Sequence, residues 1–479
     1  MRARFAASLV LFGLVASGCI RLKNPPDTPT IKTESMAKVA VPDKWVSPSG
    51  TGDVTDNWLT SFHDDQLTVA VAEAIANNPD LRVGAARVEQ AMLYAKLAGA
   101  QLYPSVDLLA KGGGGLGGDG SGLSGAIIRA TWEMDLWGRV RYGRSAARED
   151  ARSAQADFEY ARQSMAAAVA KAWFLATEAG LQAEVARASI QEGDQLVSLS
   201  ETRSRVGVGN DEDVYVARAN VGAYRDTLRQ LQLSRENAIR ALELLMGHYP
   251  AAAAAVTAQL PGQPPQVPSG LPSTLLERRP DVIAAERRVA AAFNRVHEAK
   301  AARLPTISLT AGVSAISSDL FFLKDRDNPV WNYGGSLLMP LFRGGALKTQ
   351  VEIRTTEQKQ AVAAYAQVGL RAFGEVEGAL SAENAARERE QILAQTLADN
   401  QRAYEMVQTQ YKVGSTDLRY VSQRQLALNA TRAGLVRMQS EQRVQRVNLH
   451  LALGGSFEPH PQPPAPEPTP PPKKSTPQR

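Results

Sequence analysis

The residue with the clearest chemistry is Cys19, the only cysteine in the 479-residue chain. A lone thiol cannot form a disulfide within its own chain. Two early arginines and an apolar stretch over residues 5–15 precede it. Because a membrane-spanning helix requires roughly 20 apolar residues, this stretch predicts a targeting signal rather than a span. The alternative for Cys19, a free cysteine in a protein core, has no neighbouring core residues to support it.

The residues just before the cysteine, Ala16-Ser17-Gly18, are similar to the lipobox of bacterial lipoproteins. In those proteins the cysteine thiol is acylated and the preceding signal is removed. Ala16 stands where the lipobox usually has leucine. The resemblance implies a covalent lipid on Cys19 and no other cofactor. Ile20 follows, whereas an aspartate there would have resembled the inner-membrane retention signal.

Charged residues gather at two short turns between predicted helices. Asp211, Glu212 and Asp213 follow the first turn, and Asp417 and Arg419 follow the second. Copied around a symmetry axis, such groups would form rings of charge that select cations and hold a gate shut. The alternative is that acids at helix starts cap the helix and interact with its dipole.

Other patterns give weaker signals for chemistry. The glycine-rich run over residues 112–122 lacks a following Lys-Ser/Thr pair and lies between predicted strands, which favours a loop over a phosphate site. The formal charge is +5, with acidic and basic residues interleaved, so no nucleic-acid partner is expected. The sequence shows no nucleophile–base pair and no group of metal ligands that would indicate an enzyme. Five histidines show no metal-ligand spacing and are expected at surfaces or interfaces: His63, His248, His297, His450 and His460.

The chain contains two copies of one pattern, each about 200 residues long. Pro79 and Pro104 are matched by Pro280 and Pro305, both at an offset of 201 residues. We therefore predict a signal peptide (1–18), a lipidated N-terminal segment (19–57), a first repeat (58–259), a Pro-rich linker (260–272), a second repeat (273–456) and a Pro-rich disordered tail (457–479).

Each copy predicts a Pro-started helix, two strands, a very long helix and a shorter helix. About 65 helical residues at 1.5 Å each make a rod of roughly 100 Å. Four strands per chain are too few to close a barrel, so several chains must supply strands. The predicted helices are 79–102, 139–204, 213–246, 280–303, 346–412 and 417–453, and the predicted strands are 105–110, 126–136, 306–313 and 334–341.

Residues 270–281, which contain Leu-Leu-Glu-Arg-Arg-Pro-Asp at 275–281, resemble a signature of outer-membrane efflux lipoproteins of the NodT group, within the TolC/OprM-type outer-membrane factor family. Residues 135–139 and 340–345 resemble the strand-to-helix junctions of the family, and Tyr-Lys-Val-Gly at 411–414 resembles its inter-helix turn. The likeness covers about residues 58–455.

The resemblance implies a mainly α fold with a membrane β-barrel. Three chains would form a channel-tunnel, with a 12-stranded barrel in the outer membrane of a Gram-negative bacterium and a long α-helical barrel in the periplasm. The implied partners are two further copies of the chain, a periplasmic adaptor protein, an inner-membrane efflux pump of the RND type and outer-membrane lipid.

The same resemblance implies a gate at the periplasmic tip. Asp213 and Tyr411 align with tip positions of the family, whereas the position nine residues after the turn glycine, often Asp in the family, is Gln423 here. The gate candidates are Asp211, Glu212, Asp213, Tyr411, Asp417, Arg419 and Gln423.

These observations predict a passive exit duct for small molecules or drugs that hydrolyses nothing. Two alternatives remain at this point. One is the outer-membrane duct of a type I protein secretion system, and the other is a lipid-anchored coiled-coil scaffold without a pore.

Overall fold

The computed structural model describes residues 22–37, 39–50, 52–111, 123–262, 265–318 and 329–458. Cys19, the signal peptide, the glycine-rich run 112–122 and most of the Pro-rich tail lie outside the described residues. The chain divides into two compact units. The sheet unit comprises Met1–Ala40, Arg82–Tyr160 and Pro280–Arg371, and the hairpin unit comprises Val41–Leu81, Ala161–Arg279 and Ala372–Arg479.

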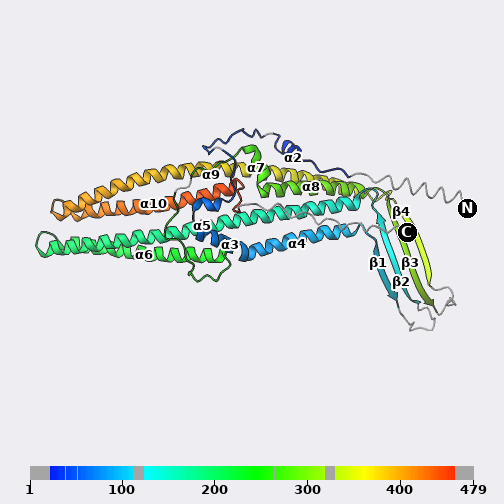
Figure 1. Ribbon diagram of the computed structural model, residues 1–479, viewed down its shortest axis with the longest axis horizontal. Helices are drawn as coiled ribbons and strands as arrows, with labels where there is room; N and C mark the ends of the chain where they lie inside the picture. Colours follow the sequence, from blue (N-terminus) through cyan, green and yellow to red (C-terminus); the bar gives the residue numbers. More distant parts are fainter. Residues whose placement is uncertain are drawn as a thin grey trace, which may run out of the picture. The chain divides into compact units, whose positions relative to one another are not determined.

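The element order repeats once along the chain (Figure 1). Helices α4 and α8 have 22 residues each, α5 and α9 have 67 each, and α6 and α10 have 35 each. This agreement confirms the internal repeat. The elements are α2 Thr28–Ser35, η1 Trp58–Phe62, α3 Asp65–Asn77, α4 Pro79–Ala100, β1 Ser105–Lys111, β2 Leu123–Met134, α5 Arg139–Arg205, α6 Asp211–Leu245, α7 Pro272–Arg278, α8 Pro280–Ala301, β3 Thr306–Ser318, β4 Val330–Leu338, α9 Ala346–Lys412 and α10 Leu418–Ala452.

Local signals explain where the helices begin and end. Pro79 and Pro280 are the first residues of α4 and α8, where a missing N–H costs nothing. Gly207 and Gly414 follow α5 and α9 with φ of 77° and 81°, the left-handed conformation that ends many helices. The strand bounds were predicted less well: β4 begins at Val330, four residues before the predicted start.

The four strands form one antiparallel sheet in the order β1-β2-β3-β4, within the sheet unit (Figure 1). Its register brings Asp107 opposite Arg129, Arg129 opposite Gly312 and Gly312 opposite Asn332. Since side chains alternate between the two faces of a strand, each such row lies on one face.

The two faces of the sheet differ in chemistry. The aromatic residues of the described strands, Trp132, Trp331 and Tyr333, share one face, which we call the apolar face. The three charged residues whose side chains are described, Asp107, Arg129 and Glu133, share the other, which we call the charged face. Strand β3 shows the alternation most clearly. It places Thr306, Ser308, Thr310, Gly312 and Ser314 on the charged face and Ile307, Leu309, Ala311, Val313 and Ala315 on the apolar face.

None of the described helices is both long enough and apolar enough to cross a membrane.

A core of large aromatic and small aliphatic side chains lies in the hairpin unit. Trp58, Phe62 and Phe174 are buried, and the Phe62 and Phe174 rings lie 5.0 Å apart. Ala166 and Ala170 on α5 are fully buried in the same core. Small residues four positions apart let helix backbones approach closely.

The two glycines that follow α5 and α6 provide a test of turn strain. Gly207 and Gly247 both have φ of 77°, but a Cβ on Gly247 would lie 2.9 Å from the Asn77 carbonyl oxygen, whereas nothing lies within 4 Å at Gly207. We expect Gly207→Ala to cost about 1–2 kcal/mol from backbone strain alone. Gly247→Ala should cost more because it adds a backbone collision. Thermal unfolding followed by circular dichroism would check this, and equal midpoints for the two variants would contradict it.

The Arg-Arg-Pro-Asp block at 278–281 begins at the end of α7, and its two arginines belong to the hairpin unit. The Arg279 side chain is 1% exposed, donates from Nη1 to the Ala452 carbonyl (3.0 Å) and pairs with Glu375 (2.6 Å). Its neighbour Arg278 is 32% exposed and pairs with Asp56. Two adjacent arginines therefore have different environments, one buried and one at the surface.

His450 corrects the expectation that the histidines lie at surfaces or interfaces. It is 3% exposed and stacks on Trp58, with ring centroids 5.7 Å apart. Burial, and then the nearby Arg446 charge, lower the pKa of His450 to about 3. Another of the five histidines, His460, lies outside the described residues.

This burial predicts an acid-dependent loss of stability. The unfolded chain binds a proton at His450 below a pH of about 6.5, whereas the folded chain does not until a pH of about 3. Protonation therefore favours the unfolded state as pH falls through this window. We expect the thermal unfolding midpoint of the wild type to decrease as pH is lowered from about 6.5 to about 3. The midpoint of His450→Phe, which keeps a ring against Trp58, should decrease less over the same range. Parallel pH curves for the two proteins would refute this.

Candidate functional site at the hairpin turns

Two helical hairpins in the hairpin unit end in short turns. The α5–α6 turn contains Gly207 and the α9–α10 turn contains Gly414. Arg203, near the end of α5, links the two turns. It donates from Nη1 to the Tyr411 carbonyl (2.5 Å) and from Nη2 to the Val208 carbonyl (3.2 Å). The turns are thus held together by one guanidinium group, whose charge strengthens hydrogen bonds.

Tyr411 lies at the centre of this cluster. The side chain is 1% exposed, and its hydroxyl donates to Asp213 Oδ2 (3.2 Å) and lies 3.1 Å from Ser200 Oγ. Burial is the main cause that raises the pKa of Tyr411, so the phenol stays protonated and can donate. The Arg203 guanidinium lies over the ring, 4.6 Å from its centroid, in a cation–π contact.

An apolar layer lies next to this polar cluster. It includes side chains from all four helices of the two hairpins, so the turns are packed together as well as hydrogen-bonded. The buried members are Leu196, Ala217, Tyr404, Tyr411, Leu418, Val421 and Leu428.

The structure brings together two of the seven predicted gate residues, Asp213 and Tyr411. Asp211 accepts a bond from Ser204 Oγ (2.6 Å) on its own hairpin, and Glu212 is exposed. Asp417 is the N-cap residue of α10 but makes no side-chain cap bond. Arg419 and Gln423 are also exposed, and neither forms a side-chain hydrogen bond or ion pair with any residue that the structure describes.

For the first helix, the capping part of the alternative is wrong, whereas the three acids do lie in the first turn of α6, where its dipole favours them. Asn210 is the N-cap residue of α6, and its Oδ1 accepts from the Asp213 backbone N–H (2.8 Å). The Asp213 carboxylate is therefore free to accept from Tyr411.

Sequence reasoning missed Ser200 and Arg203, which complete the cluster around Tyr411. Their contacts join residues 211 and 208 positions apart, so no local pattern reports them. Ser200 and Arg203 are three residues apart on α5, which places them on one helix face, and this is the signal that could have suggested a polar site.

A second polar cluster joins three of these helices, α5, α9 and α10, further along the hairpins. Arg432 on α10 donates to Glu192 on α5 (2.7 Å) and to Gln401 on α9 (2.8 Å). Burial raises the pKa of the nearby Tyr404 to about 12, which keeps its hydroxyl neutral. This cluster ties the two hairpins together at a second level.

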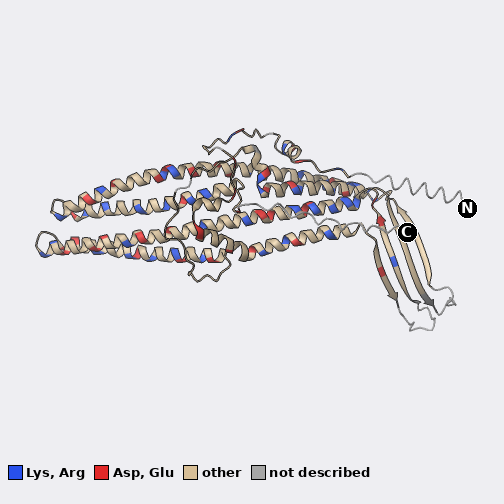
Figure 2. Ribbon diagram, in the orientation of Figure 1, with Lys and Arg blue, Asp and Glu red and all other residues tan. Residues whose placement is uncertain are grey.

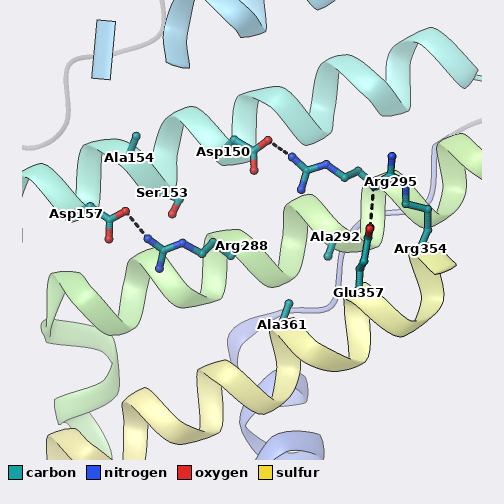
Figure 3. Close-up of a pocket in the computed structure, with 10 residues that line it drawn as sticks. All are labelled: Asp150, Ser153, Ala154, Asp157, Arg288, Ala292, Arg295, Arg354, Glu357 and Ala361. Carbon is teal, nitrogen blue, oxygen red and sulfur yellow. Dashed lines mark hydrogen bonds and ion pairs between the residues drawn. The ribbon is translucent and has the colours of Figure 1, made fainter. Parts of the chain in front are cut away.

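A pocket of about 520 Å³ lies among α5, α8 and α9 in the sheet unit (Figure 3). Arg295 pairs with Asp150, Arg288 pairs with Asp157, and Arg354 pairs with Glu357 (2.8 Å). The three positive and three negative groups balance, so the pocket has no net charge. The Ser153 hydroxyl donates to the Ala284 carbonyl (3.1 Å), so a carboxylate does not activate it.

Comparison with known proteins gives the family. The model for the family "Outer membrane efflux protein" matches residues 70–248 and 271–455, which is most of the chain. The chain belongs to the outer membrane efflux protein family.

Individual relatives cover nearly the whole chain. Cation efflux system protein CusC of Escherichia coli (strain K12) is 28% identical over 422 residues, which cover 86% of this chain and 92% of CusC. Pyoverdine export outer membrane protein OpmQ of Pseudomonas aeruginosa is 28% identical, covering 92% of this chain and 96% of OpmQ. A solved structure of CusC superposes with a TM-score of 0.80 at 26% identity, over 91% of this chain and 99% of that one.

These findings confirm the predicted fold class, the outer-membrane location and the function in efflux. The fold is shared with solved outer-membrane channels, among them CmeC of Campylobacter jejuni, which has a TM-score of 0.81 at 22% identity and therefore shows the fold alone. This family consists of efflux channel proteins, not of enzymes.

Proposed function

We propose that this protein is the passive exit duct of a tripartite system that exports small molecules. An inner-membrane pump of the RND type supplies the energy, and a periplasmic adaptor connects the two. The observation that carries the proposal is the separation of chemistry on the four-stranded sheet. One face suits lipid and the other suits a water-filled passage.

A homotrimer follows from two features of the sheet unit. Strands β1 and β4 each have one edge unpaired by the described strands, and three copies of four strands would close a 12-stranded barrel without edges. Helix α8 has thirteen buried residues, whereas its repeat partner α4 exposes a run of large apolar side chains. These side chains suit a neighbouring copy of the chain: Met92, Leu93, Tyr94 and Leu97, each 50–63% exposed.

The start of the described chain supports a lipid on Cys19. Leu22 packs at Gly138, where a Cβ would lie 2.7 Å from its Cδ2, and the Lys23 N–H donates to the Tyr142 hydroxyl (2.9 Å). Gly138 lies between β2 and α5. Leu22 is three positions after Cys19, a reach of at most roughly 10 Å. A lipid on Cys19 would therefore lie beside the junction of sheet and helix, at the edge of the membrane.

The class of cargo is inferred from relatives. Their names include cation efflux, pyoverdine export, antibiotic efflux and toluene efflux, all of which concern small solutes. This range favours small-molecule export over the type I secretion of proteins.

We further propose that the polar cluster of Ser200, Arg203, Asp213 and Tyr411 holds the duct closed at its inner end. All four groups are tied by hydrogen bonds that an adaptor could replace when it docks. The exposed charges of Asp417 and Arg419 would then be available to the adaptor. Opening the cluster should separate the two hairpin turns.

The test is the accumulation of a fluorescent dye and several antibiotics in cells that lack the gene. Accumulation should rise on deletion and return to the original level with the wild-type gene. Complementation with Cys19→Ser would measure how far function depends on the lipid. Unchanged accumulation of every tested small molecule, together with a loss of a secreted protein from the medium, would favour secretion instead.

A further inference from the structure

The charged face of the sheet carries one row that differs from its neighbours. Asp107, Arg129, Gly312 and Asn332 are aligned across all four strands. Charged residues are few in this sheet, most of which is tan in Figure 2. The next charged residue on this face, Glu133, is four residues further along β2 and pairs with Arg139 (2.8 Å) at the start of α5.

The side chains of the row are not engaged elsewhere in the described structure. Asp107, Arg129 and Asn332 are exposed in the single chain. Neither Asp107 nor Arg129 forms an ion pair with a described residue, although they stand opposite each other. The Arg139–Glu133 pair shows the contrast, because there the guanidinium makes three bonds to the carboxylate.

Gly312 explains how the row can be so polar. A Cβ at this position would lie 2.9 Å from Asn332 Oδ1 and 3.1 Å from the Ile128 carbonyl oxygen. The Asn332 side chain therefore leans over the glycine, which stands opposite Arg129. The missing side chain leaves the amide and the guanidinium on the same open patch of the charged face.

We propose that Asp107 and Arg129, with Asn332, form a ring that determines which charged solutes pass the outer part of the duct. This inference rests on the proposed function, since three copies must close around a water-filled passage. The ring formed by three chains would hold three carboxylates and three guanidinium groups and so have no net charge. A neutral ring of fixed opposite charges discriminates little between anions and cations, and suits solutes that carry both.

Neutralising Asp107 should therefore give the ring a net positive charge, and neutralising Arg129 should give it a net negative charge. Asp107→Asn leaves three positive charges, which attract anions, and Arg129→Gln leaves three negative charges, which attract cations. The double variant Asp107→Asn/Arg129→Gln restores a neutral ring and serves as the matched control.

The experiment measures the electrostatic potential at the row through the labelling rate of a cysteine placed beyond it. Ser308 lies on the charged face between the row and α8, so reagents entering from outside the cell must pass the row to reach Ser308→Cys. Its rate of modification is measured in whole cells with anionic sulfonatoethyl and cationic trimethylammonioethyl methanethiosulfonate. The closed inner end does not affect this route. The parent protein, whose one cysteine is Cys19, gives the background.

We expect the anionic-to-cationic rate ratio to rise at least about threefold in Asp107→Asn and to fall at least about threefold in Arg129→Gln. The double variant should return to the parent ratio. Unchanged ratios in both single variants, or no labelling of Ser308→Cys, would overturn the proposed ring.

A second cysteine separates this failure from failure of the proposed function. Leu309→Cys lies on the apolar face, next to the first sensor, and should be protected from both reagents by lipid. Equal labelling of Ser308→Cys and Leu309→Cys would mean that the sheet does not separate lipid from water, which would overturn the duct itself. Protected Leu309→Cys with unchanged ratios would leave the duct standing and overturn only the ring.

Discussion

Cells that produce Arg203→Ala are expected to become permeable to large antibiotics that an intact outer membrane excludes. The substitution removes two hydrogen bonds from a charged donor and the cation–π contact with Tyr411. Bonds of this kind contribute about 1.5–3 kcal/mol each, and 1.4 kcal/mol is a tenfold change in an equilibrium. The closed-to-open equilibrium constant should therefore fall at least roughly tenfold in each chain. The measurement is the inhibitory concentration of vancomycin.

Arg205→Ala is the matched control for this prediction. Arg205 is two residues away on the same helix end and carries the same charge, but it is exposed and forms no ion pair with the described residues. Tyr411→Phe, which loses only the bonds of the hydroxyl, should fall between the two variants. If Arg203→Ala cells resisted vancomycin as well as Arg205→Ala cells do, the turns would not form the barrier. Normal dye efflux by Arg203→Ala would show that the channel still assembles.

Replacement of Arg279 by alanine is expected to give the largest loss of stability in the hairpin unit. The buried guanidinium neutralises Glu375 and satisfies the Ala452 carbonyl near the end of α10. Removing one partner of a buried pair costs about 3–5 kcal/mol. Because Glu375 is 39% exposed and can be rehydrated, we expect the lower end of this range. Thermal unfolding of the purified protein in detergent would measure the loss.

Arg278→Ala provides the comparison within the same dipeptide. Its pair with Asp56 is about one-third exposed on both sides, and such pairs contribute about 0–1 kcal/mol. The Arg279 variant should thus unfold at a clearly lower temperature than the Arg278 variant. Similar midpoints would show that burial of Arg279 does not govern the stability of this region.

The order and lengths of the elements could be predicted from the sequence because their signals are local. Pro79, Pro280, Gly207 and Gly414 mark helix ends within a few residues, whatever the chain packs against. The start of β4 was predicted too late, because Gly334 and Gly335 lie inside the strand rather than at its beginning. There the pairing with β3 outweighs the weak strand preference of glycine.

The candidate site could be predicted only in part. Asp213 and Tyr411 were identified by their place in the turns, but their partners Ser200 and Arg203 depend on the packing of one hairpin against the other. Burial of His450 likewise depends on Trp58, which lies almost four hundred residues away. Such long-range contacts follow from the fold and not from residue type or spacing.

The equal lengths of the paired helices restrict how this sequence can change over time. Both hairpins consist of a 67-residue helix followed by a 35-residue helix. At 1.5 Å per residue, deletion of seven residues from each arm of one hairpin would draw its turn back by roughly 10 Å. Arg203 could then no longer reach Tyr411 on the other hairpin. Insertions and deletions in these helices should therefore be inherited in matched sets of four, one in each arm, whereas single substitutions can accumulate independently in the two halves.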